Sequence, residues 1–270
     1  GGGGNGEFIS LTEFSGNPVV CLTVPLLIII GGLGFFVWHD IRKNRHHVSR
    51  YGLHTKIVLV TTAAFIIIPT LIIMCAETDL TITERIFSSF FTAVSPRTAG
   101  FNVLDLNNVR LVTVFLTIIL MCIGGASGST AGGIKVNTFA VLVLSLFSIA
   151  RRKNSVEAFG KRIDEENIKT ATQFVTMYLS VAIVGVIMIC LFEMGNPYEM
   201  SLTDIVFEVA SGIGTVGLTL GITPHLGAGS LVVLAMLMYL GRVGCLTFML
   251  CFRAPSDPVA ILPQESVRIG

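Results

Sequence analysis

The sequence predicts an all-α membrane protein built from repeated units, each consisting of a helix, a short re-entrant helix with a loop, and a second helix. Three observations lead to this prediction. Of the 270 residues, 52% are hydrophobic and 13% are charged, against roughly 25% charged residues in an ordinary soluble domain. The mean hydropathy is +0.79. Long apolar runs recur along the chain, and one hairpin-like pattern occurs twice. The net charge of +1 gives no indication of a nucleic-acid partner.

Four segments are long and apolar enough to cross a bilayer, which takes about 20 such residues. They are residues 18–38, 57–75, 170–192 and 229–251. A fifth apolar stretch, 109–150, is too long for one span, because a continuous helix of that length would measure roughly 63 Å. It is interrupted by a segment rich in glycine and serine. We therefore expect this stretch to unwind or fold back inside the membrane.

The charged residues assign the connecting segments to two sides of the membrane. Most Lys and Arg residues, 13 of 18, lie in three segments: 39–56, 151–169 and the tail after residue 251. Nine of the 17 acidic residues, and no Lys or Arg, lie in three others: 1–17, 76–84 and 193–208. The positive-inside rule makes the first set cytoplasmic and the second external. The spans then alternate only if two segments enter the membrane and return to the outer side: 84–108 and 201–228.

These two predicted re-entrant hairpins share a pattern at a spacing of 117 residues. The shift places "FFTAVSPRTAGF" on "FEVASGIGTVGL", so that four identical pairs coincide: Phe90 and Phe207, Ala93 and Ala210, Thr98 and Thr215, and Gly100 and Gly217. A helix of about three turns reaches only halfway across the membrane, and extended backbone must follow it. Such backbone is tolerated only where it is buried in protein or lines a water-filled cavity.

Extended backbone at this depth can bind a cation, because its carbonyl groups can replace the hydration shell of the ion. Glycine permits the φ angles that turn successive carbonyls to one side. A tight turn between packed helices is the simpler explanation for one copy of Thr-x-Gly, but not for two copies in matching hairpins. The candidate ion-binding residues are Thr98, Ala99, Gly100, Phe101 and Asn102 in the first hairpin, and Gly214, Thr215, Val216, Gly217 and Leu218 in the second.

Four motifs together carry a resemblance to a known family: "SPRTAGFN", "GTVGLTLGITPHLG", "GGASGSTAGGIK" and "YLGRVG". From about residue 17 to its end the chain resembles the potassium-translocating subunits of the bacterial Trk and Ktr systems, relatives of the plant HKT transporters. The resemblance implies K⁺ uptake through a pseudo-fourfold pore, in which each of four repeats supplies one filter strand with a key glycine. K⁺ would then be the ion bound at the filter residues.

The resemblance also implies a division of the chain. Residues 51–160 and 161–270 would be two complete repeats. Residues 18–50 would be the last helix of the preceding repeat with its cytoplasmic loop, and residues 1–17 an external segment that follows a missing upstream filter. We therefore expect the C-terminal half of such a subunit.

In the resembled family a flexible loop below the filter interrupts one inner helix and is thought to gate the pore. The matching candidate gate residues are Gly124, Gly125, Ala126, Ser127, Gly128, Ser129, Thr130, Ala131, Gly132, Gly133 and Lys135. Glycine, serine and threonine can bond locally and move at low cost. The alternative is that these small residues form a helix-packing surface.

Arg242 is a further gate candidate, because the shift of 117 residues places its neighbour Gly241 on Gly124. An arginine deep in a spanning segment costs several kcal/mol unless it finds water or a partner, and is functional by default. We expect its five N–H donors to face the pore and to hold the loop shut, or its charge to repel the ion. The alternative is an arginine at the cytoplasmic edge. Glu208 is a weaker candidate, either as an acid that attracts cations or as a buried, hydrogen-bonded carboxylate.

A different function class is suggested by "GASG", which fits the Gly-x-Ser-Gly motif of rhomboid-type intramembrane serine proteases. Ser127 would be the nucleophile and His225 its base, on an adjacent helix at the same depth. The topology argues against this, because His225 is predicted at the external end of the second hairpin. We therefore expect a transporter and not an enzyme, with no cofactor beyond the transported K⁺. Whether Na⁺ or H⁺ is coupled to K⁺ is left open.

The resemblance finally implies a multi-pass protein of the bacterial inner (plasma) membrane, in contact with lipid. Relatives form homodimers and sit on cytoplasmic nucleotide-binding regulatory subunits of the TrkA or KtrA type. The basic loops 39–56 and 151–169 are the segments that we expect to contact such a subunit.

Overall fold

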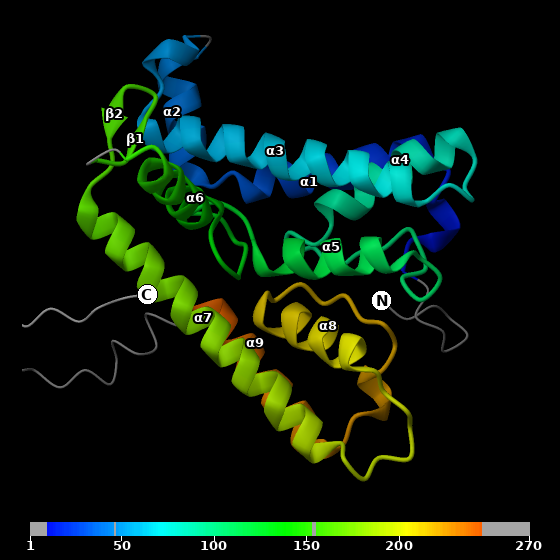
Figure 1. Ribbon diagram of the computed structural model, residues 1–270. Helices are drawn as coiled ribbons and strands as arrows, with labels where there is room; N and C mark the ends of the chain where they lie inside the picture. Colours follow the sequence, from blue (N-terminus) through cyan, green and yellow to red (C-terminus); the bar gives the residue numbers. More distant parts are fainter. Residues whose placement is uncertain (1–9, 46, 153–154, 245–270) are drawn as a thin grey trace, which may run out of the picture.

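The computed structural model describes residues 10–45, 47–152 and 155–244. Within these ranges the chain is a helical bundle (Figure 1). Its α-helices are α1 (Pro18–Gly32), α2 (Phe35–Asn44), α3 (Leu53–Ala76), α4 (Ile82–Val94), α5 (Leu111–Cys122), α6 (Val136–Ala150), α7 (Glu165–Phe192), α8 (Leu202–Ile213) and α9 (Ala228–Val243). The shorter elements are the 3-10 turns η1 (Thr12–Phe14), η2 (Val48–Arg50) and η3 (Thr223–His225), and the strands β1 (Glu157–Ala158) and β2 (Lys161–Arg162).

Two helices, α3 with 24 residues and α7 with 28, are long and apolar enough to cross a membrane by themselves. They confirm the spans predicted at 57–75 and 170–192. The bent pair α1 and α2 counts as a third if it is taken as one span. The span predicted at 229–251 begins in α9, and its end lies outside the described residues, as do residues 1–9 of the predicted external segment. The antiparallel pair β1 and β2 adds a small hairpin to the predicted all-α fold.

The prediction of one continuous helix over 18–38 is wrong. α1 ends at Gly32, and α2 leaves at 90° to it. Gly34 allows the turn, since its φ is +78° and a Cβ atom there would lie 2.7 Å from the carbonyl oxygen of Ser127. The indole Nε1 of Trp38 donates to the carbonyl of Ile30 at 3.0 Å and so satisfies an acceptor at the end of α1. Hydropathy predicts the apolar run but not this bend.

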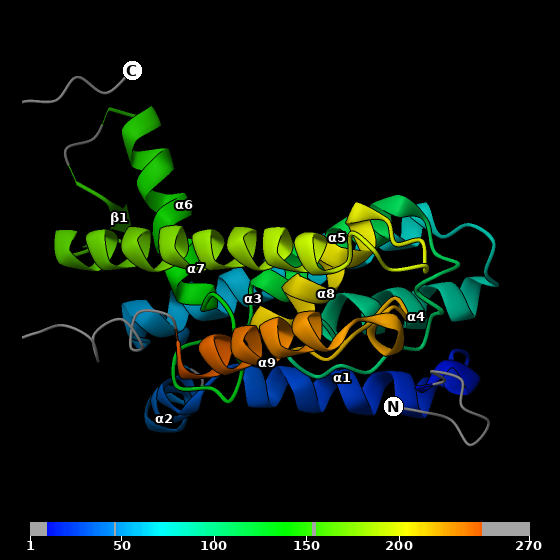
Figure 2. The same cartoon turned by 90° about the horizontal axis from the view of Figure 1, so that it is seen from below.

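The predicted interruption of 109–150 is confirmed. α5 and α6 are separated by a non-helical segment, residues 123–135, and α6 leaves in a direction different from that of α5 (Figures 1 and 2). Two backbone bonds close the base of this segment, from the N–H of Gly124 to the carbonyl of Ile134 and from the N–H of Ile134 to the carbonyl of Cys122, both at 2.9 Å.

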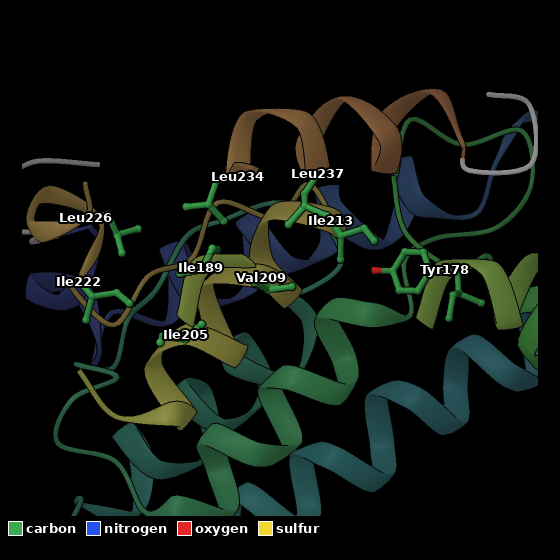
Figure 3. Close-up of a cluster of buried hydrophobic side chains, with 10 residues drawn as sticks. Tyr178, Ile189, Ile205, Val209, Ile213, Ile222, Leu226, Leu234 and Leu237 are labelled. Carbon is green, nitrogen blue, oxygen red and sulfur yellow. The ribbon is translucent and has the colours of Figure 1, made fainter. Parts of the chain in front are cut away.

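Two short helices occupy the predicted re-entrant hairpins. α4 has 13 residues and packs on α1 and α3, while α8 has 12 residues and packs on α5, α7 and α9. The largest buried cluster joins α7, α8 and α9, where Tyr178, Ile213 and Leu237 are at most 3% exposed (Figure 3). The outer face of α7 keeps large apolar side chains exposed, among them Ile183 at 60%, which suits contact with lipid.

A carboxylate ties the outer helix to the following inner helix in both halves of the chain. Directly after α3, Glu77 accepts hydrogen bonds at its Oε1 atom from the N–H of Arg110 at 2.9 Å and from the hydroxyl of Thr113 at 2.6 Å. Directly after α7, Glu193 accepts from the N–H of the residue before α9 at 2.8 Å and from the hydroxyl of Ser230. The donors in the two halves are related by the same shift of 117 residues. Each carboxylate therefore caps the first turn of an inner helix.

We expect Glu193 to make the stability of the fold dependent on pH. Burial alone would raise the pKa of its carboxyl group, but hydrogen bonds from Asn196, Ser230 and the N–H of Gly227 outweigh burial and lower this pKa. A carboxyl group whose pKa is lowered by folding stabilises the fold above its ordinary pKa. That contribution is lost as the pH falls through the lowered, folded-state value. The melting temperature of the detergent-solubilised protein should therefore fall on acidification below about pH 4.5.

Glu193→Gln should lower the stability at neutral pH by roughly 1–3 kcal/mol and remove this part of the acid dependence. The exposed Glu199 lies in the same external segment, and Glu199→Gln is the matched control. An acid dependence that is the same in Glu193→Gln and in the unchanged protein would contradict the expectation.

Two glycines in apolar helices form a matched pair for testing how closely α9 packs on α8. A Cβ atom on Gly241 would lie 1.9 Å from the carbonyl oxygen of Ile213. For Gly31 in α1, no described atom beyond the local helix backbone lies within 4 Å of the added Cβ atom. Gly241→Ala should lower the free energy of unfolding by at least about 1–3 kcal/mol, because α9 must move. Gly31→Ala should leave it unchanged or raise it slightly. Equal melting temperatures in the two variants would show that the close approach is absent.

Candidate ion-conducting site and gating loop

The loops that follow the two short helices have the same unusual backbone. The φ angles of Thr98 and Gly100 are +63° and +73°, and those of Thr215 and Gly217 are +54° and +88°. A positive φ is uncommon for threonine and costs on the order of 1–3 kcal/mol. Its occurrence at equivalent positions of both hairpins indicates a shared requirement. Left-handed residues at every second position can turn successive carbonyl groups to one side, as a cation site needs.

Hydrogen bonds hold the first loop, residues 98–102, against α4. The N–H of Ala99 donates to the carbonyl of Ser95 at 3.2 Å, and the hydroxyl of Ser95 donates to the carbonyl of Phe101. The N–H of Asn102 donates to the hydroxyl oxygen of Ser10 at 3.2 Å. The carbonyl of Phe101 is thus engaged inside the hairpin, whereas Phe101 and Asn102 were predicted together with the preceding three residues as ion ligands.

The second loop, residues 214–218, is held by α8 in a similar way. The N–H of Gly214 donates to the carbonyl of Ala210, and the N–H of Val216 to the carbonyl of Ser211, both at 2.9 Å. The N–H of Gly217 donates to the hydroxyl of Ser211 at 3.1 Å. Leu218 is buried, 5% exposed, and its side chain packs in the core.

Several N–H groups of the two loops form hydrogen bonds, whereas most of the carbonyl groups do not. Within the part of the chain that the structure describes, no hydrogen bond reaches the carbonyl oxygens of residues 98–100 or 214–217. The two loops also approach one another, because a Cβ atom on Gly100 would lie 2.3 Å from the carbonyl oxygen of Val216. Free carbonyl groups from two hairpins therefore meet at one place.

Glu208, in the middle of α8, is 6% exposed. Its carboxylate accepts hydrogen bonds from the hydroxyl of Thr223 at 3.0 Å and from that of Thr219. Of the two predicted alternatives, the structure therefore has the buried, hydrogen-bonded carboxylate. Glu208 fixes the segment that leaves the second loop.

Arg97 lies beside the first loop and was not singled out from the sequence. It is 6% exposed, and its guanidinium donates to the carbonyl of Thr62 in α3 at 3.2 Å. With residues of α1, the first loop and the interrupting segment it lines a cavity of about 360 Å³; the lining includes Gly31, Gly32, Arg97, Thr98, Thr130 and Ala131. A search restricted to spanning helices misses this arginine, although a basic residue inside a re-entrant hairpin is itself a signal.

Residues 124–135 of the interrupting segment, which we call the gating loop after the role predicted for them from the sequence, dock first on the bend between α1 and α2. The N–H of Ala126 donates to the carbonyl of Gly32 at 2.8 Å, and the N–H of Phe35 donates to the carbonyl of Gly128 at 3.0 Å. Ala126 is fully buried in a cluster with Leu33, Val37 and Val58. The segment is not helical, so the alternative of a helix-packing surface is wrong.

Two side chains hold the rest of the gating loop. The side-chain oxygen Oδ1 of Asn137 in α6 accepts from the N–H of Ser127 at 3.1 Å and from its hydroxyl at 2.9 Å. The guanidinium of Arg242 donates to the carbonyl of Thr130 at 2.6 Å. This is the hydrogen bond that the predicted latch requires.

The position of Arg242 differs from the prediction. It lies in the last turn of α9, which ends at Val243, and its side chain is exposed and not deep within a longer helix. The following Gly244 has a φ of +90°, which suits the end of a helix. A cation is favourable at this end because of the helix dipole.

Inside the gating loop, Ser129 and Lys135 donate to carbonyl groups of the loop itself, the hydroxyl of Ser129 to Ala126 at 2.6 Å and the Nζ atom of Lys135 to Ala131. The loop is compact enough to require its glycines. A Cβ atom on Gly124 would lie 2.0 Å from the carbonyl oxygen of Gly132.

The gating loop also touches the second filter loop. A Cβ atom on Gly132 would lie 2.2 Å from the hydroxyl oxygen of Thr215, the threonine with a positive φ. Two further glycines of the gating loop are also constrained. A Cβ atom on Gly125 would lie 2.9 Å from the carbonyl oxygen of Gly32, and Gly133 has a φ of +67°. The gating loop therefore lies directly against the loop at residues 214–218.

The structure does not bring the proposed protease pair together. The hydroxyl of Ser127 donates to Asn137, whereas the ring of His225 stacks on Tyr198 with centroids 4.1 Å apart. His225 lies in η3, near the end of the second hairpin (201–228), and its carbonyl accepts a hydrogen bond from Asn196 just after α7. The protease hypothesis is therefore wrong.

Comparison with known proteins points to cation transport. The family model described as "TrkH: Cation transport protein" matches residues 9–260. The chain is 36% identical to the potassium/sodium uptake protein NtpJ of Enterococcus hirae, and 36% identical to the Ktr system potassium uptake protein B of Bacillus subtilis. Each alignment covers 97% of this chain and 59% of the relative. The chain thus spans about three fifths of the length of these relatives.

A solved structure has the same fold. The potassium transporter TrkH of Vibrio parahaemolyticus superposes with a TM-score of 0.73 at 18% identity, over 92% of this chain and 54% of that one. Together with the apolar helices, these matches identify a membrane protein of a transporter family and not an enzyme. The chain belongs to the TrkH family of cation transport proteins.

Proposed function

We propose that this chain supplies two filter strands of a K⁺-conducting pore, as the ion-translocating subunit of a Trk- or Ktr-type uptake system. The observation that carries the proposal is the meeting of two loops, 98–100 and 214–217, whose carbonyl oxygens accept no hydrogen bond within the described ranges. The names of the relatives, which are potassium or potassium/sodium uptake proteins, support this choice of ion.

Selectivity would come from the backbone. A cation that enters the filter loses water, and carbonyl oxygens replace that water if they point toward the ion at fixed positions. The left-handed Thr and Gly of each loop supply this orientation, and the N–H bonds to α4 and α8 keep it. A glycine at the filter position of both hairpins goes with K⁺ in the resembled family. The other two strands of a fourfold pore would come from outside this chain segment.

The gating loop would control passage below the filter. It touches Thr215 at the base of the second filter and is fixed by the bend between α1 and α2, by Asn137 and by Arg242. Release of these contacts would let the loop leave the ion path. In this proposal the guanidinium of Arg242 is a latch on the carbonyl of Thr130 as well as a positive charge near the path.

The setting of the pore is part of the proposal. We place it in a bacterial inner membrane as a multi-pass protein, with repeats at 51–160 and 161–270, although residues after 244 lie outside the described ranges. One relative is named as part of a "Ktr system", which supports the proposal that this subunit works together with a further protein component. A homodimer on a cytoplasmic nucleotide-binding regulatory subunit is the assembly that we propose.

The filter assignment predicts different effects for two serine substitutions. Gly100→Ser should lower the K⁺ over Na⁺ preference by about ten-fold or more, because its Cβ atom would lie 2.3 Å from the carbonyl oxygen of Val216 and its φ is +73°. Gly217→Ser should have a smaller effect, since only its φ of +88° opposes the substitution. The measurement is ⁸⁶Rb⁺ uptake into proteoliposomes in competition with K⁺ and Na⁺. The matched control is Gly195→Ser in an external turn. Unchanged preference in both filter variants would remove the assignment.

The latch predicts that Arg242 and the gating loop act together. Arg242→Ala should raise K⁺ flux, and so should deletion of residues 126–132. The double variant should gain less than the product of the two effects, with a coupling of roughly 0.5–3 kcal/mol, which is about 2-fold to 150-fold. Arg242→Lys should be intermediate, because it keeps the charge but loses the planar fork of donors.

Flux in proteoliposomes checks this cycle, with Lys169→Ala, an exposed cation at the start of α7, as the control. If the deletion variant does not fold, Asn137→Ala takes its place, since it removes only the two bonds to Ser127. Strict additivity in log flux would mean that Arg242 acts on the ion alone. No change in Arg242→Ala would place it outside the ion path.

A further inference from the structure

We propose that α2 is a membrane-surface helix that binds anionic lipid headgroups at the cytoplasmic face, and that this binding keeps the gating loop in its docked position. The inference rests on the proposed function of the loop as a gate. It adds a partner, the inner-leaflet lipid, and a route by which that partner acts.

The direction of α2 is the first step of the argument. α1 runs in nearly the same direction as α3, which is long enough to cross a membrane, whereas α2 is bent by 90° from α1 (Figures 1 and 2). A helix at a right angle to a spanning helix lies along the membrane surface. The bend follows the apolar run of α1, and Arg42 and Lys43 in the last turn of α2 place this end on the cytoplasmic side.

The side chains of α2 have the distribution of an interfacial helix. Val37 is fully buried against α3, while Phe35 and Trp38 are 62% and 41% exposed at the start of the helix. The exposed Arg42 and Lys43 follow at its end. Aromatic groups at the acyl boundary together with cations at the headgroups are typical of helices that lie in the interface.

The charge that α2 presents is positive. Its one acidic residue, Asp40, is turned inward, where its carboxylate accepts from the N–H of Gly52 at 2.8 Å and from the side-chain amide of Asn44 at 2.5 Å. Lys43 interacts electrostatically with Asp40, but within the described ranges neither Arg42 nor Lys43 forms a side-chain ion pair, and both remain exposed. Such a surface is complementary to phosphate headgroups of anionic lipids, at about 1 kcal/mol for each Lys or Arg.

The start of α2 is joined to the gating loop. Besides the bond from the N–H of Phe35 to the carbonyl of Gly128, a Cβ atom on Gly128 would lie 2.9 Å from ring atoms of both Phe35 and Phe36. Ala126 of the loop is bonded to Gly32 before the bend. A movement of α2 therefore displaces the first half of the loop. Lipid that fixes α2 should favour the docked loop and so lower K⁺ flux.

Trp38 provides a direct probe, because it is the only tryptophan among these 270 residues, and any tryptophan elsewhere in the full-length subunit can be replaced by phenylalanine for this experiment. The purified full chain, reconstituted in vesicles that contain brominated phosphatidylcholine, should show quenched Trp38 fluorescence if α2 lies at the lipid interface. Addition of phosphatidylglycerol should increase the quenching and should lower ⁸⁶Rb⁺ flux relative to vesicles of phosphatidylcholine alone.

A pair of charge-neutralised variants isolates α2. In Arg42→Gln/Lys43→Gln the effect of phosphatidylglycerol on flux should largely disappear, since the two charges are together worth up to about a 25-fold shift in the equilibrium. Flux in phosphatidylcholine vesicles should stay as in the unchanged protein. The matched control is Arg151→Gln/Lys161→Gln, which removes two exposed cations from the next cytoplasmic segment. This control should keep the full response to phosphatidylglycerol.

Four results would overturn the inference. They are Trp38 that is not quenched, an equal loss of the lipid response in the control pair, a full lipid response in Arg42→Gln/Lys43→Gln, and suppression of flux by soluble glycerol phosphate in phosphatidylcholine vesicles. Failure of the proposed function would look different. Flux would be absent or unselective in every variant, or unaffected by deletion of residues 126–132, while quenching of Trp38 would still report whether α2 lies on the lipid.

Discussion

Backbone groups that leave a helix at membrane depth must find partners, and this requirement governs how the non-helical parts of the chain are arranged. The carbonyl of Gly32, freed by the bend after α1, accepts from Ala126, and the N–H of Phe35 donates to Gly128. The gating loop and the bend therefore satisfy each other. The carbonyl oxygens of 98–100 and 214–217 are different, since no described group donates to them. A dehydrated cation is the partner that would complete them.

The two halves of the chain share a backbone conformation and a type of helix cap, but different side chains support their loops. The left-handed Thr and Gly, and the donors that the capping carboxylates of α5 and α9 accept from, follow the same spacing of 117 residues, while the two carboxylates are 116 residues apart. The supports do not. Arg97 ties the first loop to α3 and stands where the second half has Gly214, and the second loop depends instead on Glu208, which binds two threonines beyond the filter. The two loops therefore have the same left-handed backbone but different supporting contacts.

Much of the fold could be predicted because hydropathy and repetition are local signals. They identified the spans in α3 and α7, the interruption before α6 and the doubled Thr-x-Gly. Hydropathy could not predict the 90° bend at Gly34, because the backbone that packs against it, the carbonyl of Ser127, lies more than 90 residues away in the sequence. The caps formed by Glu77 and Glu193 were not predicted either, because each carboxylate binds donors more than 30 residues away in the sequence. The internal repeat alone predicted that Arg242 meets the loop. Its position in the last turn of α9 could not be predicted, because the sequence did not show where that helix ends.

The docked gating loop has a strength that suits a switch. Besides the backbone hydrogen bonds to the adjoining ends of α5 and α6, two hydrogen bonds join it to the bend, two to the side chain of Asn137 and one to Arg242. At about 0.5–1.5 kcal/mol each, they hold the loop by roughly 3–7 kcal/mol. The full reversal of a two-state equilibrium takes about 5.5 kcal/mol. The anchors lie on three separate elements, α6, α9 and the bend before α2. No single anchor has to supply the whole free energy of opening.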